Sequence, residues 1–137
     1  MKYSKAIYLF LGISMFMFGF LKFFDPFKGW YSVQISKSGL GAVSYGLGIL
    51  GELVVGTIFL SLLIFRQGIR PKHHVLLSAF ASVVVIAMMS TGTYVHLHPN
   101  VPADVLPLKI KPPFIPLIFL AAALLNLLST WRNYKIS

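Results

Sequence analysis

The sequence predicts an all-α, polytopic membrane protein that folds as a bundle of four transmembrane helices. The chain has 137 residues, 57% of them hydrophobic, and its mean hydropathy is +0.81. Four apolar stretches, residues 4–23, 45–65, 75–94 and 114–130, each approach the roughly 20 residues needed to cross the hydrocarbon core of a bilayer. The charged residues lie mostly between these stretches. Residues 1–137 are therefore expected to form one membrane domain in contact with the lipid bilayer.

The basic residues predict how these helices are oriented. A net charge of +9 would suggest nucleic-acid binding in a soluble protein, but the basic residues here flank the apolar stretches, so no nucleic-acid partner is expected. The side of the termini carries Lys2, Lys5, Arg66, Arg70, Lys72, Arg132 and Lys135; the other side carries Lys22, Lys28, Lys37, Lys109 and Lys111, with Asp25 and Asp104. The more basic side is predicted to be cytoplasmic. We expect the bacterial cytoplasmic (inner) membrane, with both termini in the cytoplasm.

The first apolar stretch follows a basic start, as a signal peptide does. Residues 18–22, where cleavage would fall, contain no small-x-small site, so we expect the segment to be retained as a helix. Four residues at steps of three and four share one helical face: Gly12, Met15, Gly19 and Lys22. Lys22 ends this face on the outer side, where a lone lysine commonly extends to the lipid headgroups.

Residues 25–41, which connect the first two stretches, begin with a helix-stopping Asp-Pro pair. Phe27, Trp30, Tyr31 and Ile35 are spaced so that they would form one apolar face of a helix. A short helix lying in the membrane interface fits this spacing. The alternative is an ordinary belt of aromatic residues, because Trp and Tyr are enriched at headgroup level.

The second stretch contains Glu52, one of only three acidic residues in the chain. A carboxylate inside a membrane span is costly unless it is protonated, paired or hydrated, so it marks a functional site. Four residues spaced one helical turn apart share its face: Ser44, Gly48, Glu52 and Gly56. Small residues allow membrane helices to pack closely, so Glu52 should point into the bundle. Counted from Tyr45, Glu52 lies about 10 Å deep. We predict an ion pair with Lys22, which lies in the same outer half.

The third stretch is polar mainly at its outer end, which carries Ser90, Thr91, Thr93, Tyr94 and His96. Together with Lys22, Asp25 and Glu52, these side chains are predicted to line a pocket that opens outward. The alternative is that the hydroxyls bond back to helix carbonyls and that Tyr94 anchors the helix at the interface. Residues 66–74, on the other side of the membrane, are predicted to form a tight basic turn with His73 and His74 solvated.

His96 and His98 form a His-x-His pair whose rings would splay apart on a helix. No third ligand stands at a suitable spacing, so no metal site is expected. His96 is instead predicted to accept a proton at the mouth of the pocket, because the reference pKa of histidine lies near neutral pH.

Residues 97–113 contain five prolines, which predict a rigid lid with no helix of its own. Its apolar side chains would cover either the mouth of the bundle or another subunit. On the fourth stretch Ala122, Asn126 and Ser129 share a face. Asn126 is predicted to bond between helices in the inner half of the bundle, because buried amides commonly link membrane helices.

Two short motifs carry a resemblance to a known family. Phe18-Gly19-Phe20-Leu21-Lys22-Phe23 is followed by Asp25-Pro26, and Gly51-Glu52 precedes Gly56 in the second stretch. In these motifs, and in the order and length of its spans, the chain resembles the DoxX-like group of small four-helix membrane proteins. The resemblance implies a four-helix bundle. It also implies an association with quinone-linked sulfur oxidation and terminal oxidase complexes, or with the accessory and chaperone roles of similar proteins.

Two functional hypotheses follow. In the first, the protein is an accessory subunit of a quinone-linked redox complex: Lys22, Glu52 and Tyr94 would hold a quinone, and Glu52 or His96 would exchange a proton with it. The chain has no cysteine and no self-contained catalytic constellation, so a partner would supply the electron carrier. The expected protein partners are other membrane subunits or further copies of the chain.

In the second hypothesis the protein is a non-enzymatic assembly factor or chaperone, and the pair of Lys22 and Glu52 only fixes the register of two helices. A small transporter is less favoured, because four short helices without a visible inverted repeat leave little room for alternating access.

Overall fold

A computed structural model shows that the described part of the chain is helical, which confirms the predicted all-α class. The structure describes residues 2–136, with side chains described for residues 5–132 and 134. Within that range there are five α-helices, α1 (Lys2–Leu21), α2 (Phe27–Lys37), α3 (Ala42–Ile64), α4 (Pro71–Leu97) and α5 (Phe114–Ile136). Three single-turn 3-10 helices lie in the connections, η1 (Arg66–Gly68), η2 (Ala103–Val105) and η3 (Pro107–Lys109).

Three of the described helices are long and apolar enough to cross a membrane: α3, α4 and residues Phe114–Arg132 of α5. The apolar part of α1 for which side chains are described, Lys5–Leu21, is shorter. Each predicted apolar stretch falls largely on one of these four helices, with shifted ends. Their length and composition are those of a membrane protein. Lys2 and Lys135, which contributed to the predicted charge bias, lie outside the described side chains.

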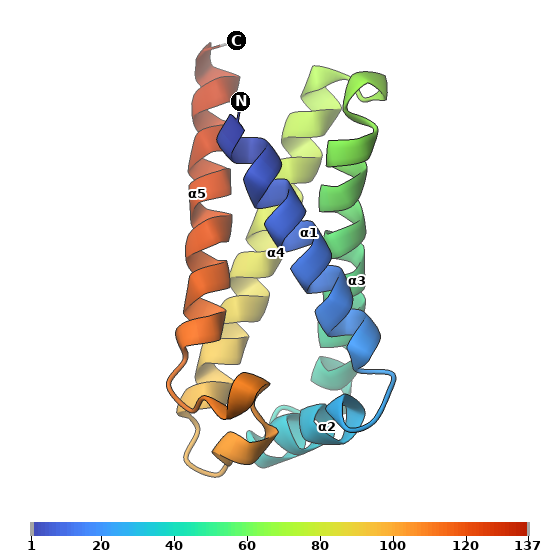
Figure 1. Ribbon diagram of the computed structural model, residues 1–137. Helices are drawn as coiled ribbons and strands as arrows, with labels where there is room; N and C mark the ends of the chain where they lie inside the picture. The colour runs from blue at the N-terminus through green and yellow to red at the C-terminus, as the bar shows by residue number, and fades with distance from the viewer. Residues whose placement is uncertain (1, 137) are drawn as a thin grey trace.

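The four long helices run along one another, and α2 lies across one end of the bundle (Figure 1). The helix α1 packs most extensively against α3, and α4 packs against α5. The start of α1 and the end of α5 lie at the end of the bundle opposite to α2. An interior of apolar side chains joins all four helices, and its fully buried members include Leu11, Met15, Phe59, Val85 and Ala123.

The connection from α2 to α3 depends on two glycines. Gly39 has φ = 78° and Gly41 has φ = 97°, both in the left-handed region where a side chain would be strained. At the end of α2, the Leu40 amide donates to the Ile35 carbonyl and the Gly39 amide donates to the Ser36 carbonyl. This pair of bonds is the Schellman motif, which ends a helix on a left-handed residue. The chain can therefore leave α2 and start α3 within a few residues.

The proline-rich segment between α4 and α5 lies on the mouth of the bundle, which was one of the two predicted alternatives. Val101 and Leu106 are buried in a small apolar cluster with Val95 of α4, and Leu40 packs against them. The Lys111 ammonium donates to the His98 carbonyl at 2.6 Å. Two 3-10 turns, η2 and η3, interrupt the segment. Val101 and Leu106 thus face inward on this chain, whereas Leu108 in the same segment is 82% exposed.

The turn between α3 and α4 is shorter than predicted. The helix α4 begins at Pro71, because proline at the first helical position has its backbone already set for the helix and lacks only an amide that would be unpaired there. His73 and His74 therefore lie in the first turn of α4. The prediction that both are loop residues is wrong, because both are helical. His73 is exposed as predicted, but His74 is half-buried and has its Nε2 buried without a hydrogen-bond partner.

Candidate functional site

The close approach of α1 and α3 creates the candidate site. A β-carbon on Gly56 would lie 2.7 Å from the Phe16 amide nitrogen, and one on Gly19 would lie 3.2 Å from the Glu52 β-carbon. The predicted stripe of small residues on α1 therefore faces the one on α3. Membrane helices pack closely through such small residues, because no hydrophobic effect drives them together in lipid. This packing brings the end of α1 alongside the middle of α3.

Lys22 and Glu52 form an ion pair, as the sequence predicted. Lys22 follows the last residue of α1, and its ammonium donates to Glu52 Oε1. The Glu52 side chain is 6% exposed and that of Lys22 is 20% exposed. At the helical rise, Glu52 lies about 15 Å from the start of α3. This depth exceeds the expected value because α3 begins at Ala42 and not at Tyr45.

Tyr31 of α2 completes this group, and the sequence did not indicate its role. The Lys22 ammonium lies 4.4 Å from the centroid of the Tyr31 ring, a cation–π contact. The Tyr31 hydroxyl donates to the Tyr45 carbonyl at 2.9 Å. It can approach α3 only because Gly48 has no side chain: a β-carbon there would lie 2.1 Å from the hydroxyl oxygen.

Burial raises the pKa of the Tyr31 phenol, and the negative charge of Glu52 raises it further. Because its hydroxyl is a donor and its ring faces a cation, Tyr31 remains a neutral phenol at physiological pH. Of the residues predicted to share the apolar face of α2, Tyr31 and Ile35 are buried, whereas Phe27 is 39% exposed. What the spacing could not predict is that α2 turns back across α3 and brings that face to Glu52.

Tyr94 and His96 make their contacts with connecting segments. The Tyr94 hydroxyl donates to the Ser38 carbonyl at 2.8 Å, and Nδ1 of the buried His96 lies 3.3 Å from the Lys111 carbonyl. A carbonyl only accepts, so this bond requires a proton on Nδ1 and leaves Nε2 as the acceptor of a neutral ring. Tyr94 and His96 therefore bond to the connecting segments. Lys22 and Glu52 instead bond to each other, and the Lys22 ammonium contacts the Tyr31 ring.

The other polar residues at the outer end of α4 follow the structural alternative. The hydroxyls of Ser90, Thr91 and Thr93 donate to carbonyls one turn earlier in the same helix, at 2.7, 3.0 and 2.9 Å. Asp25, which was predicted to line the same pocket, is exposed. The proton-transfer and quinone-binding roles of Glu52, Lys22, His96 and Tyr94 stay predictions.

A second polar cluster lies in the other half of the bundle. Asn126 is 1% exposed, and its Nδ2 donates to the hydroxyls of Ser78 at 2.9 Å and Ser82 at 2.7 Å. Tyr8 donates to Ser78 at 3.0 Å, and Thr130 lies 3.3 Å from the same hydroxyl. The prediction that Asn126 bonds between helices is confirmed. Its serine partners were missed, because single serines in an apolar stretch give no periodic signal.

In the part of the chain with described side chains, no group of three or more His, Cys, Asp or Glu residues is placed to hold a metal ion. Comparisons with protein-family models, with curated proteins and with solved structures find no match for this chain. The resemblance to the DoxX-like group therefore stays a prediction, which rests on the two short motifs of the sequence.

Proposed function

We propose that this protein is a small accessory subunit of a membrane complex and that Lys22, Glu52 and Tyr31 form a site for a polar headgroup such as that of a quinone. The observation that supports the proposal is the ion pair of Lys22 and Glu52 within the bundle. Apolar residues of similar volume commonly stabilise a fold as well as a buried ion pair does. An ionisable pair at this depth is therefore better explained by function than by packing.

The donor set at this site suits a quinone oxygen. Lys22 has three N–H donors, of which Glu52 takes one, and its side chain is 20% exposed, so a ligand oxygen could reach the others. Glu52 is a carboxyl group that can hold or release a proton in the outer half of the bundle. In this proposal Lys22 orients the headgroup and Glu52 carries a proton. A cofactor-bearing partner subunit would supply the electrons.

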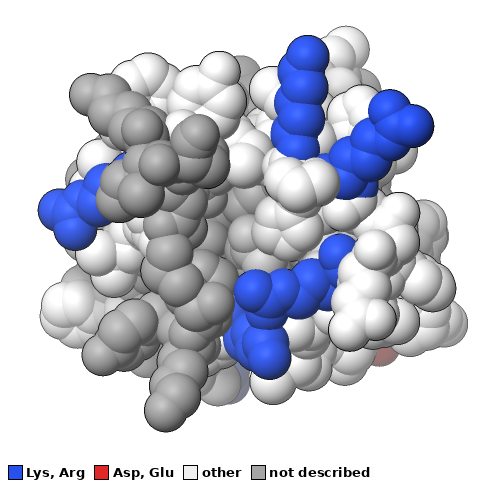
Figure 2. Space-filling view, turned by 90° about the horizontal axis from the view of Figure 1, so that it is seen from above, with Lys and Arg blue, Asp and Glu red and all other residues white. Residues whose placement is uncertain are grey.

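For the topology, we propose that α1, α3, α4 and α5 all cross the membrane and that both termini lie in the cytoplasm of a bacterial cell. The helix α1 has 20 residues, which at the helical rise cover about 30 Å, the thickness of a hydrocarbon core. Lysine and arginine side chains project at the end of the bundle that carries the termini (Figure 2). Asp25 and Asp104 belong to the opposite end, next to α2 and in η2 (Figure 1). In the sequence the end that carries the termini has seven Lys and Arg residues against five at the α2 end, and this excess supports the cytoplasmic placement of the termini.

The quinone site can be tested by tryptophan fluorescence. The chain has two tryptophans, Trp30 beside Tyr31 and Trp131 near the end of α5. A Trp131→Phe variant in detergent would be titrated with a short-chain benzoquinone, which quenches a nearby indole. We expect saturable quenching of Trp30 that Glu52→Gln weakens about tenfold, because the substitution removes the charge that holds the Lys22 ammonium in place for the quinone oxygen, and a lost charge-assisted contact is worth about 1.4 kcal/mol or more.

The matched control is Asp104→Asn, which makes the same chemical change at an exposed acid and should leave quenching unchanged. Linear, non-saturating quenching that is equal in Trp131→Phe and in Trp30→Phe would contradict a quinone site near Trp30. Native mass spectrometry of the gently extracted wild-type protein would test the partner. We expect a second subunit with flavin, haem or metal.

A non-enzymatic assembly factor or chaperone is the second candidate. The contacts of Lys22 with Glu52 and with the Tyr31 ring favour this candidate. Side chains that already pair with one another can fix the register of two helices without binding a ligand. In that case Glu52→Gln would leave both the assembly and the electron transfer of the partner complex at wild-type levels. In the redox proposal, Glu52→Gln would leave assembly intact and lower electron transfer.

A further inference from the structure

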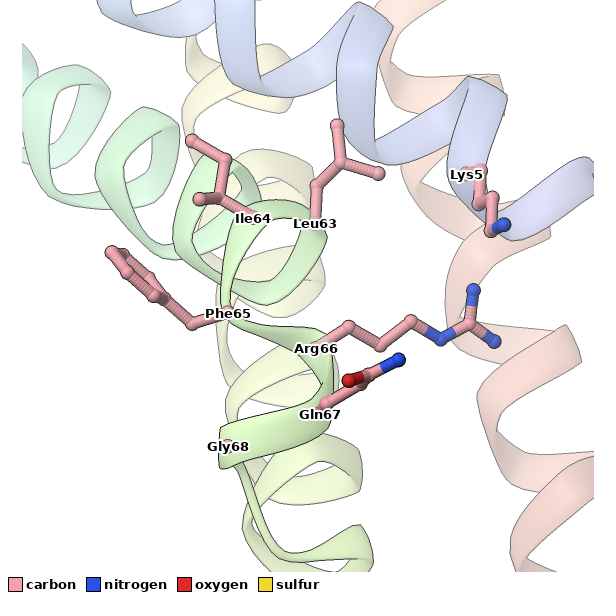
Figure 3. Close-up of a pocket in the computed structure, with 7 residues that line it drawn as sticks. All are labelled: Lys5, Leu63, Ile64, Phe65, Arg66, Gln67 and Gly68. Carbon is pink, nitrogen blue, oxygen red and sulfur yellow. The ribbon is translucent and has the colours of Figure 1, made fainter.

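A pocket of about 540 Å³ lies at the end of the bundle that carries the termini. One wall is the last turn of α3, and the other side is reached by Lys5 of α1. The ammonium of Lys5 and the guanidinium of Arg66 point toward one another across this space, and the amide of Gln67 lies beside the guanidinium (Figure 3). Two cations thus converge on one cavity.

No acidic side chain of the chain is placed to neutralise these cations. Of the three acids, Glu52 is paired with Lys22, and Asp25 and Asp104 lie at the far end of the bundle. Like charges that face one another repel, and an anion between them removes the repulsion. The pocket is therefore complementary to an anion. Arg66 would bind it with two parallel N–H bonds, the geometry that suits phosphate oxygens.

The apolar wall indicates which kind of anion fits. Ile64 is 68% exposed and Phe65 is 63% exposed; both belong to the lining of the pocket, and their side chains point away from the Arg66 guanidinium (Figure 3). Ile64 is the last residue of α3, a helix of membrane-spanning length and composition, and Phe65 follows it. At this level of a bilayer, the cations would meet lipid headgroups and the apolar side chains would meet acyl chains. A free phosphate ion would use only the cations and leave the apolar wall uncovered.

We infer that this pocket binds the phosphate of an anionic phospholipid, with Lys5, Arg66 and Gln67 on the headgroup and Ile64 and Phe65 on the start of an acyl chain. Basic pockets between membrane helices are a recurring form of lipid headgroup site. This inference uses none of the residues of the Lys22–Glu52–Tyr31 site and does not depend on a quinone. It adds a defined lipid partner at the opposite end of the molecule.

Native mass spectrometry in a neutral detergent can test the inference by titration with phosphatidylglycerol, phosphatidylcholine or inorganic phosphate. We expect one phosphatidylglycerol to bind about tenfold more tightly than phosphatidylcholine, a difference that two charge contacts readily provide. The double variant Lys5→Gln with Arg66→Gln should lose this preference. Arg70→Gln with Lys72→Gln removes the same charge from the same end without touching the pocket, and should keep it.

All four of these side chains are exposed, so both double variants are expected to fold, which far-UV circular dichroism would verify. Equal loss of the preference in the two double variants would overturn the site in favour of diffuse attraction to charge. Retention of the preference after Lys5 and Arg66 are changed would overturn it as well. Binding of inorganic phosphate with no preference between the two lipids would overturn the assignment to a lipid.

Discussion

The substitution Gly56→Ala tests the close approach of α1 and α3, on which the whole candidate site depends. A β-carbon added to Gly56 would lie 2.7 Å from the amide nitrogen, 2.8 Å from the β-carbon and 2.9 Å from the α-carbon of Phe16. Two of these atoms belong to the backbone and the third is fixed to it, so no side-chain rotation can make room. The helix α1 must move as a body.

The size of the effect follows from these distances. Carbon atoms pack best about 3.5–4.0 Å apart, so α1 would have to retreat by about 0.7 Å or more. Overpacking against fixed atoms costs about 3 kcal/mol, the upper part of its usual range. Alanine is favoured over glycine within a helix by about 1 kcal/mol. We therefore expect Gly56→Ala to lower the free energy of unfolding by about 2 kcal/mol.

Two other glycines provide matched controls. A β-carbon on Gly46, also in α3, would meet nothing within 4 Å, so Gly46→Ala should be neutral or stabilising by up to about 1 kcal/mol. A β-carbon on Gly12 would meet the Leu60 side chain at 2.9 Å, which can rotate away in part, so Gly12→Ala should fall between the two. Unfolding by SDS in mixed micelles, followed by circular dichroism, measures all three. Equal stabilities for the Gly56 and Gly46 variants would refute the packing of α1 on α3.

Two further predictions use the same unfolding assay. Tyr31→Phe removes the hydrogen bond to the Tyr45 carbonyl but keeps the ring beside Lys22, so it should lower the free energy of unfolding by about 1 kcal/mol. Wild-type stability would show that this bond does not hold α2 in place. Asn126→Leu removes two interhelical hydrogen bonds of about 0.6 kcal/mol each, a loss of about 1 kcal/mol. A loss above about 3 kcal/mol would show that the cluster does more than link α4 to α5.

Much of the candidate site was predictable because it lies on helical faces. The spacing of small residues fixed the face of Glu52, and the stripe that ends at Lys22 identified its partner. Both features follow from the period of the α-helix, which can be counted directly along the sequence. Tyr31 was not predictable as a member of the site. Its position depends on the direction in which the segment after Lys22 turns. This short segment is not a regular helix, so its sequence shows no repeating spacing from which the direction could be predicted.

The sequence by itself determined the class of the protein, the location of its long helices and the helical faces on which Glu52 and Lys22 lie. These features depend on local composition and on the helical period, so they are written in consecutive residues. The tertiary structure decided which residues meet across elements: Tyr31 with Lys22, Asn126 with Ser78, and Lys5 with Arg66 around one pocket. Such meetings depend on the crossing of helices and the path of loops, which are set by packing of the whole chain.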